Sequence, residues 1–237
     1  TDTSGEGHDA NSLNAIAAID QATDTPTNNF ATLNPLQKFS GTASNNPILT
    51  EGATVHTSTL DDYWQTSIAT IGVTSGKWYF EAKILDDNTP LVMVGVGDEG
   101  DIPTWGWGNG YLGAGKSVSY SSGSSAYTDS NVIGMAVDVD NGKVYWAKDN
   151  TYINSGNPAG NANGTALPTG GVSNGTYFIG VSGYKDDAAV LQVNFGGYHA
   201  NSLSSAASDG NGYGTFEFAP PSGFYALCTK NLAEFGG

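Results

Sequence analysis

The stretch from Asn131 to Lys148 constrains the fold most, because two runs of alternating apolar residues flank an Asn-Gly pair. Asn141-Gly142 is a strong signal for a two-residue type I′ turn, in which both central residues need φ > 0. The stretch therefore predicts a β-hairpin of fixed register. The expected pairs are Asp140–Lys143, Val139–Val144, Asp138–Tyr145 and Val137–Trp146.

This hairpin has two distinct faces, because successive side chains of a strand point to opposite sides. The apolar face collects Ile133, Met135, Val137, Val139, Val144 and Trp146. The other face carries Ala136, Asp138, Asp140, Lys143, Tyr145 and Ala147, and we expect it to lie in water with one cross-strand ion pair. A sheet that is apolar on one side needs a second layer to cover that side.

Other segments supply the strands for such a second layer. Residues 77–84 alternate core aromatics with Lys77, Tyr79, Glu81 and Lys83 on the outward side, and residues 91–97 are apolar on both sides. Residues 176–182 and 188–195 read as two further strands. Strands with long loops between them, and no alternation with helices, predict an all-β antiparallel sandwich.

The N-terminal part differs from the rest of the chain. Residues 12–20 could form two helical turns, and the segment after them is rich in turn residues and holds two prolines. We therefore predict an extended N-terminal arm over residues 1–40 and a sandwich domain over residues 41–237, with strands beginning at about residue 39. The arm's isolated apolar residues would anchor it in grooves of the domain or of a neighbour. These candidate anchors are Phe30, Leu33 and Leu36.

The charge balance excludes some partners. The formal net charge is −15, and all eight basic residues are lysines. Nucleic acid and anionic membrane surfaces are disfavoured, because an acidic surface repels them and arginine is absent. No stretch approaches 18 apolar residues, so we expect no membrane insertion. The single cysteine, Cys228, lies in an apolar run and is expected to be a buried thiol. The start at Thr1 without Met favours a processed product or a part of a longer protein.

Four segments form a recognisable series: Gly76-Lys77-Trp78-Tyr79-Phe80-Glu81, Val94-Gly95-Val96-Gly97, residues 133–146, and Val193-Asn194-Phe195-Gly196 ahead of an aromatic-Pro-Pro segment. Together they resemble the SPRY (B30.2-like) domain. Two flanking phrases, residues 24–36 and 218–232, are similar to SPRY-containing structural proteins of tailed bacteriophages, particularly marine ones. The chain departs from the family pattern by inserted loops at about 101–127 and 196–214, so the resemblance does not determine which face binds a ligand.

The resemblance implies a concanavalin-like sandwich that serves as a binding module without catalytic residues or cofactors. It also implies a virion surface protein, of the fibre, tail or capsid-decoration type. Its partners would be other virion proteins or copies of itself, with a homo-oligomer such as a trimer expected.

A second hypothesis is a glycan-binding tip that recognises a host surface. Trp105, Trp107 and Tyr111 lie in a glycine-rich loop and are the candidate ligand-binding residues, because exposed aromatic faces stack on sugars. The alternative is that these three aromatics cap the end of the sandwich.

Metal and hydrolase chemistry find less support. Asp138-Val139-Asp140-Asn141-Gly142 fails the spacing of a calcium loop, so no metal site is predicted. A polysaccharide hydrolase needs two carboxyls about 5–10 Å apart across a cleft. Glu81 and Glu217 alternate with core aromatics and look like outward strand positions, so we predict no enzyme.

Overall fold

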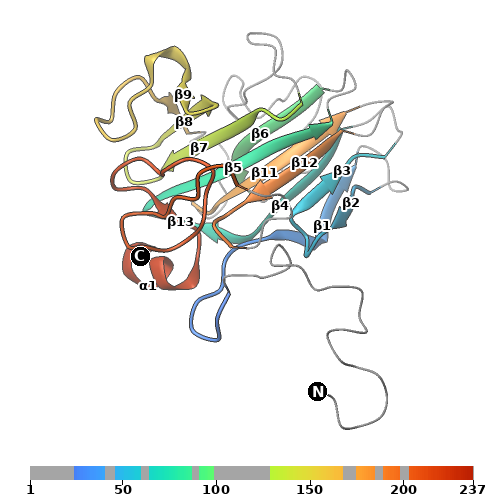
Figure 1. The fold of residues 1–237 in the computed structure, drawn as a ribbon, viewed down its shortest axis with the longest axis horizontal. Helices are drawn as coiled ribbons and strands as arrows, with labels where there is room; N and C mark the ends of the chain where they lie inside the picture. The colour runs from blue at the N-terminus through green and yellow to red at the C-terminus, as the bar shows by residue number, and fades with distance from the viewer. Residues whose placement is uncertain are drawn as a thin grey trace.

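Two β-sheets packed face to face make up the centre of the structure (Figure 1). The computed structural model describes residues 24–40, 46–59, 64–86, 91–98, 129–167, 175–184, 189–197 and 203–236. The four-stranded sheet consists of β1 (Leu33–Ser40), β4 (Trp64–Val73), β11 (Tyr177–Tyr184) and β6 (Leu91–Asp98), in that order. All its neighbouring strands run antiparallel.

The second sheet has nine strands. Its main order is β10 (Thr165–Ala166), β8 (Lys143–Lys148), β7 (Val132–Asp138), β5 (Lys77–Asp86), β12 (Val190–Asn194), β3 (Val55–Thr57) and β2 (Ile48–Thr50). Two short strands lie off this path: β9 (Thr151–Tyr152) pairs with β8, and β13 (Tyr225–Ala226) pairs with β5. The sequence prediction of an all-β antiparallel sandwich is confirmed.

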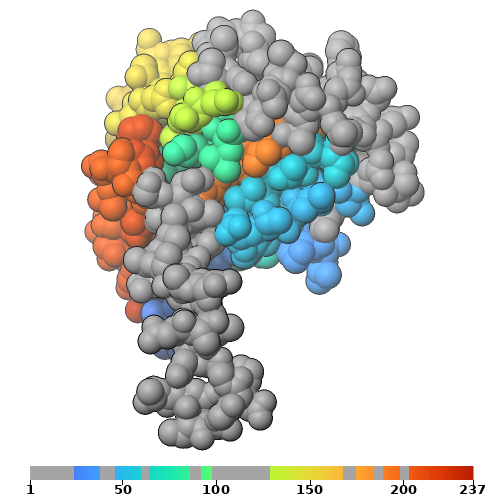
Figure 2. Space-filling model, turned by 45° about the vertical axis from the view of Figure 1, so that its right-hand side comes forward, coloured from blue at the N-terminus to red at the C-terminus, as the bar shows by residue number. Residues whose placement is uncertain are grey.

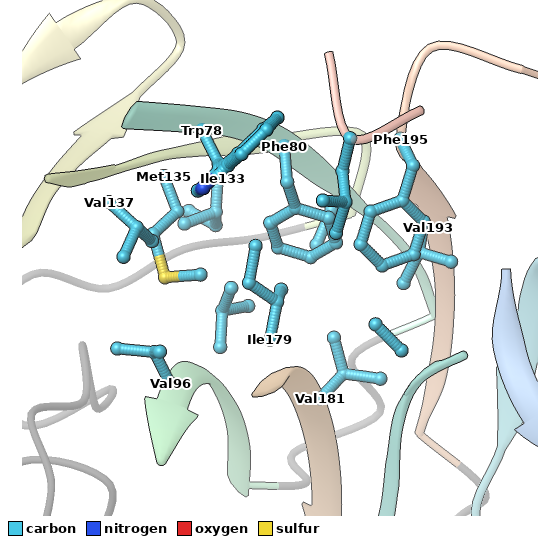
Figure 3. Packing of buried hydrophobic residues seen from close by; sticks show 14 of the residues in the cluster. Trp78, Phe80, Val96, Ile133, Met135, Val137, Ile179, Val181, Val193 and Phe195 are labelled. Carbon is cyan, nitrogen blue, oxygen red and sulfur yellow. The ribbon is translucent and has the colours of Figure 1, made fainter. Parts of the chain in front are cut away.

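The main core lies between the two sheets (Figure 3). Trp78 and Phe80 of β5 meet Val96 of β6 and Ile179 and Val181 of β11, all of them buried. Each such side chain contributes roughly 1.5–3 kcal/mol by leaving water. The hairpin face predicted to be apolar points into this core. Its buried members are Ile133, Met135, Val137, Val144 and Trp146.

The register of the hairpin differs from the prediction by two residues. The observed pairs are Asp138–Lys143, Val137–Val144, Ala136–Tyr145 and Met135–Trp146. The loop therefore holds four residues, 139–142, and only Gly142 among them has a positive φ, of 62°. A shift by two residues keeps every side chain on its predicted face, since the side-chain period of a strand is two.

Most of the hairpin face predicted to lie in water is buried instead, since Ala136, Asp138, Tyr145 and Ala147 are buried, whereas Asp140 is exposed and Lys143 is half-buried. A C-terminal layer, residues 203–236, crosses the outer side of the nine-stranded sheet and ends in the helix α1 (Thr229–Phe235) (Figure 1). Between this layer and the sheet lies an outer aromatic cluster. Its members are Phe216, Phe224, Ala226 and Cys228 from the layer and Phe30, Tyr79, Ala136 and Tyr145 from the rest of the chain. The layer covers this face because Phe216 and Phe224 need burial as much as the aromatics of the sheet do.

The four-stranded sheet begins earlier than expected. Strand β1 starts at Leu33 and pairs with β4, so it lies within the stretch predicted as an arm. A register irregularity between Leu33 and Lys38 bends this strand. At the other end of the described residues, the short strand β13 is followed by the helix α1.

Candidate functional site

The structure does not place the candidate sugar-binding aromatics. Trp105, Trp107 and Tyr111 lie outside the described residues, and so do residues 12–20, for which two helical turns were predicted. Their roles stay predictions. The described residues offer three other features: a junction between two distant segments, an exposed edge, and a buried carboxylate.

Phe30 holds the junction between the early segment and the C-terminal layer. Phe30 and Cys228 face each other as an isolated antiparallel pair. The backbone N–H of Ala31 donates to the carbonyl of Leu227 at 2.9 Å, and that of Thr229 donates to Asn29 at 2.9 Å. This pairing brings together the two flanking phrases of the sequence, about 200 residues apart.

Glycine makes room for Phe30 in the outer aromatic cluster. A Cβ atom on Gly197 would lie 2.8 Å from the Cβ of Phe30, and one on Gly196 would lie 3.1 Å from its ring. Phe30 is 8% exposed and Leu33 is fully buried in the main core, so both contact their own domain. Phe30 thus occupies a socket that larger residues at 196 and 197 would fill.

Leu36 does not pack on its own domain, in contrast to Phe30 and Leu33. Its side chain is 92% exposed, and the bend of β1 presents it outward. The side-chain oxygen of Asn34 accepts the N–H of Leu36 at 2.9 Å, and the Asn34 amide donates to Gln37 at 3.2 Å. These bonds fix the bend locally.

Ile48 of β2 is the other exposed large hydrophobic residue of the described ranges, at 51%. The backbone N–H of Leu33 donates to the carbonyl of Ala53 at 2.9 Å, which ties the start of β1 to the turn after β2. The two strands therefore lie on one flank of the molecule, where their blue and cyan atoms adjoin (Figure 2). Two separate exposed apolar side chains do not make a large apolar patch.

Glu81 is the buried carboxylate, although the sequence indicated an outward position. It does point to the outer side of β5, but the C-terminal layer covers it and leaves it 2% exposed. One oxygen accepts the N–H of Phe218 at 2.8 Å and the hydroxyl of Tyr79 at 3.1 Å. The other accepts the N–H of Glu217 at 2.8 Å and the Asn194 amide at 3.4 Å.

The surroundings of Glu81 disfavour its charge. Burial is the main cause that raises its pKa, from 4.5 to about 7, against the opposing effect of the two backbone N–H groups. The nearby Glu217 raises it further. Tyr79 shares the site, and burial followed by the charge of Glu81 raises its pKa far above the usual range, as it does for Tyr152. In this conformation Glu81 binds backbone N–H groups of the C-terminal layer and does not face solvent.

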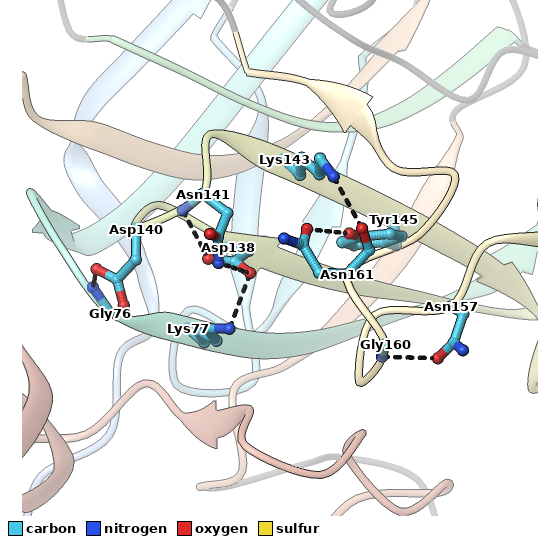
Figure 4. Close-up of polar contacts among 10 residues, drawn as sticks. All are labelled: Gly76, Lys77, Asp138, Asp140, Asn141, Lys143, Tyr145, Asn157, Gly160 and Asn161. Atoms are coloured by element: carbon cyan, nitrogen blue, oxygen red, sulfur yellow. Dashed lines mark hydrogen bonds and ion pairs between the residues drawn. The ribbon is translucent and has the colours of Figure 1, made fainter.

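The acidic residues of the hairpin also accept hydrogen bonds from backbone N–H groups (Figure 4). Asp138 was expected to lie in water, yet it is buried and pairs with Lys77 at 3.0 Å. Asp138 also accepts the N–H of Asn141 at 2.9 Å, and Asp140 accepts the N–H of Gly76 at 2.7 Å. Lys143 was expected to pair with Asp140, but it donates to the carbonyl of Asn161 at 2.8 Å. These contacts replace the predicted ion pair of the hairpin.

Two further polar side chains, those of Asp209 and His56, are buried. Asp209 accepts the backbone N–H groups of Asn211, Tyr213 and Ala226 and the Asn231 amide, all within 2.9 Å. His56 lies 2.9 Å from the Ser67 hydroxyl through Nδ1, and burial lowers its pKa from 6.5 to about 3. His56 is therefore neutral, and the buried His56–Ser67 pair is not accessible to a substrate in the observed conformation.

Within the described ranges, no group of three or more His, Cys, Asp or Glu residues could hold a metal ion. No helix in the described part of the chain is long and apolar enough to cross a membrane.

The fold and these sites define an all-β sandwich with an outer C-terminal layer. No protein-family model and no curated protein sequence matches the chain. Among solved structures, it is similar to the SPRY domain of human HERC1, at 13% sequence identity and a TM-score of 0.45. The match covers 68% of this chain and 96% of that one.

Proposed function

We propose that the chain is a non-enzymatic structural and adhesion module on the surface of a bacteriophage particle, in a fibre, a tail or a capsid decoration. The observation that carries the proposal is the pair of phrases at residues 24–36 and 218–232, which resemble phage structural proteins. The pairing of Phe30 with Cys228 adds support, because it joins these two phrases in one contact.

The charge and the described chemistry agree with a binding role. A formal net charge of −15 disfavours nucleic acid and leaves proteins or neutral glycans as partners. The buried carboxylates of Glu81 and Asp209 hold backbone N–H groups, which is a structural use. Leu36 of the expected arm is free to contact a neighbouring virion protein or a second copy.

Locating the chain in purified particles tests this role. We expect mass spectrometry to detect it in the particles, and gold-labelled antibodies against the folded domain to decorate their exterior. Antibodies preabsorbed with the purified protein are the control. Absence from the particles, or labelling only after they are opened, would overturn the proposal. A particle reconstruction then separates a trimeric fibre from a lattice of decoration proteins.

The alternative is a glycan-binding tip, and the aromatic loop with Trp105, Trp107 and Tyr111 favours it. Glycan-array binding that is lost in Trp107→Ala and kept in Leu36→Ala would support this alternative. Release of reducing ends from host polysaccharide would instead support a hydrolase. The absence of both would leave a protein partner.

A further inference from the structure

The strap, residues 203–218, is the part of the C-terminal layer that closes over Glu81. Phe216 of the strap is fully buried and meets the Tyr79 ring of the sheet edge-on, with the ring centroids 5.2 Å apart. Ala207 and Phe216 pair with each other through two backbone hydrogen bonds, and Thr215 N–H donates to Gly196 at 2.9 Å. The strap is therefore a small folded unit seated on the sheet.

Glu81 connects the strap to the sheet. Its carboxylate receives two consecutive backbone N–H groups, those of Glu217 and Phe218, each at 2.8 Å. Asn194 of β12 adds a second connection, because its amide donates to the Thr215 carbonyl at 2.9 Å. If the strap lifts, Glu81 gains water and loses both main-chain donors.

No cation balances Glu81 within the described part of the chain. The groups that face it are Tyr79 from its own strand, Asn194 from β12, Tyr152 from β9 and Glu217 from the strap. None of them is positively charged. A buried carboxylate without a counter-charge costs free energy in its ionised form, so it holds a proton more tightly than a solvated one does.

The neutral form fits the same contacts. A protonated carboxyl still accepts hydrogen bonds, so it can keep the two backbone N–H groups while its own proton goes to the Tyr79 hydroxyl oxygen. That hydroxyl can rotate to accept, whereas the backbone N–H groups cannot. The site thus accommodates a proton without losing its hold on the strap.

We propose that Glu81 makes the strap a pH-dependent flap, held more tightly in acid than at neutral or alkaline pH. The closed state binds a proton at Glu81 more tightly than an open, solvated state does. Lowering the pH therefore favours closure, and raising it through neutrality favours opening. Opening uncovers Tyr79 and Phe216 of the outer aromatic cluster. This inference does not depend on the proposed function.

Native-state hydrogen exchange of the Glu217 and Phe218 amides tests the flap. From pH 5 to pH 8 we expect their protection factors, corrected for intrinsic exchange, to fall on the order of 100-fold, from the difference between the pKa values of the open and closed states. In Glu81→Gln this dependence should vanish. Glu217→Gln leaves Glu81 in place but removes the neighbouring charge that raises its pKa, so this variant should keep the dependence and move its midpoint to lower pH.

A second measurement needs no variant. The carboxyl ¹³C resonance of Glu81 in the wild-type protein should titrate near neutrality. Protection that is constant with pH in the wild type, or equally pH-dependent in Glu81→Gln, would overturn the proposal. A Glu81 carboxyl that titrates in the ordinary acidic range would overturn it as well.

Discussion

A disulfide between residues 30 and 228 should form without rearrangement of the backbone. Phe30 and Cys228 face each other across two antiparallel segments, and the hydrogen bonds flank the pair on both sides. Such a non-hydrogen-bonded pair has a Cα separation of about 4.5 Å, which lies within the range that disulfides span. Cys228 is the single cysteine of the chain, so Phe30→Cys offers it one partner.

Two opposing effects set the stability of this variant. The bond would close a loop of about 200 residues, for which the chain-entropy model gives about 5 kcal/mol of stabilisation. Loss of the Phe30 ring from its socket works against it, since Phe→Ala changes in a core cost ~3–5 kcal/mol. Oxidised Phe30→Cys should therefore match the wild type to within a few kcal/mol, whereas the reduced variant should be much less stable.

Urea unfolding with and without reductant measures the difference directly, and a non-reducing gel with peptide mapping identifies the bond. Burial raises the pKa of the Cys228 thiol, so oxidation needs alkaline pH and time. Ala31→Cys is the control, because neighbouring side chains of an extended segment point to opposite sides. A folded Phe30→Cys protein that forms no intrachain disulfide, or an Ala31→Cys protein that forms one equally well, would refute the pairing.

Three further changes probe other buried contacts. Burial lowers the pKa of His56 from 6.5 in the unfolded chain to about 3. As the pH falls from 6.5 toward 3, the free energy of unfolding should therefore fall by up to ~1.4 kcal/mol per pH unit. Urea titrations at several pH values should show that His56→Gln lacks this slope. In Gly134→Ala the new Cβ would lie 2.8 Å from the Tyr79 hydroxyl. Thermal unfolding should therefore show that the free energy of unfolding is lower by ~1–3 kcal/mol. An unchanged melting temperature would contradict this contact. Asp209→Asn replaces one acceptor oxygen with an NH₂ group that would face hydrogen-bond donors. We expect urea unfolding to show a free energy of unfolding lower by about 2 kcal/mol or more. A decrease below ~0.5 kcal/mol would count against a structural role.

Alternation along the chain predicted the faces of the hairpin but not its register. The apolar side of residues 133–146 repeats every second residue, which is a local property of the sequence. The length of the turn depends on contacts with a distant residue, because Asp140 accepts the N–H of Gly76 and Val139 donates to the carbonyl of Gly76. A rule for Asn-Gly dipeptides does not include a residue that lies more than 60 positions away.

The outer layer was missed for a similar reason. Polar residues such as Glu81 and Asp138 on every second position of a strand indicate a wet face. Here they fasten other segments, and Phe216 and Phe224 cover the aromatics between them. The surplus of aromatics in residues 213–225 was the available signal. For the arm, the sequence indicated Phe30 and Leu33 as anchors, but the bend that exposes Leu36 depends on contacts of Asn34 that sequence does not reveal.

The contact of residues 28–31 with 227–230 also bears on synthesis. A ribosome adds ~5–20 residues per second, so the first of these segments waits on the order of 10–40 s for its partner. During that interval the socket of Phe30 does not exist, and nascent chains carry an uncovered aromatic surface. We therefore expect chaperones to stay bound to nascent chains until residues 227–230 have left the ribosome.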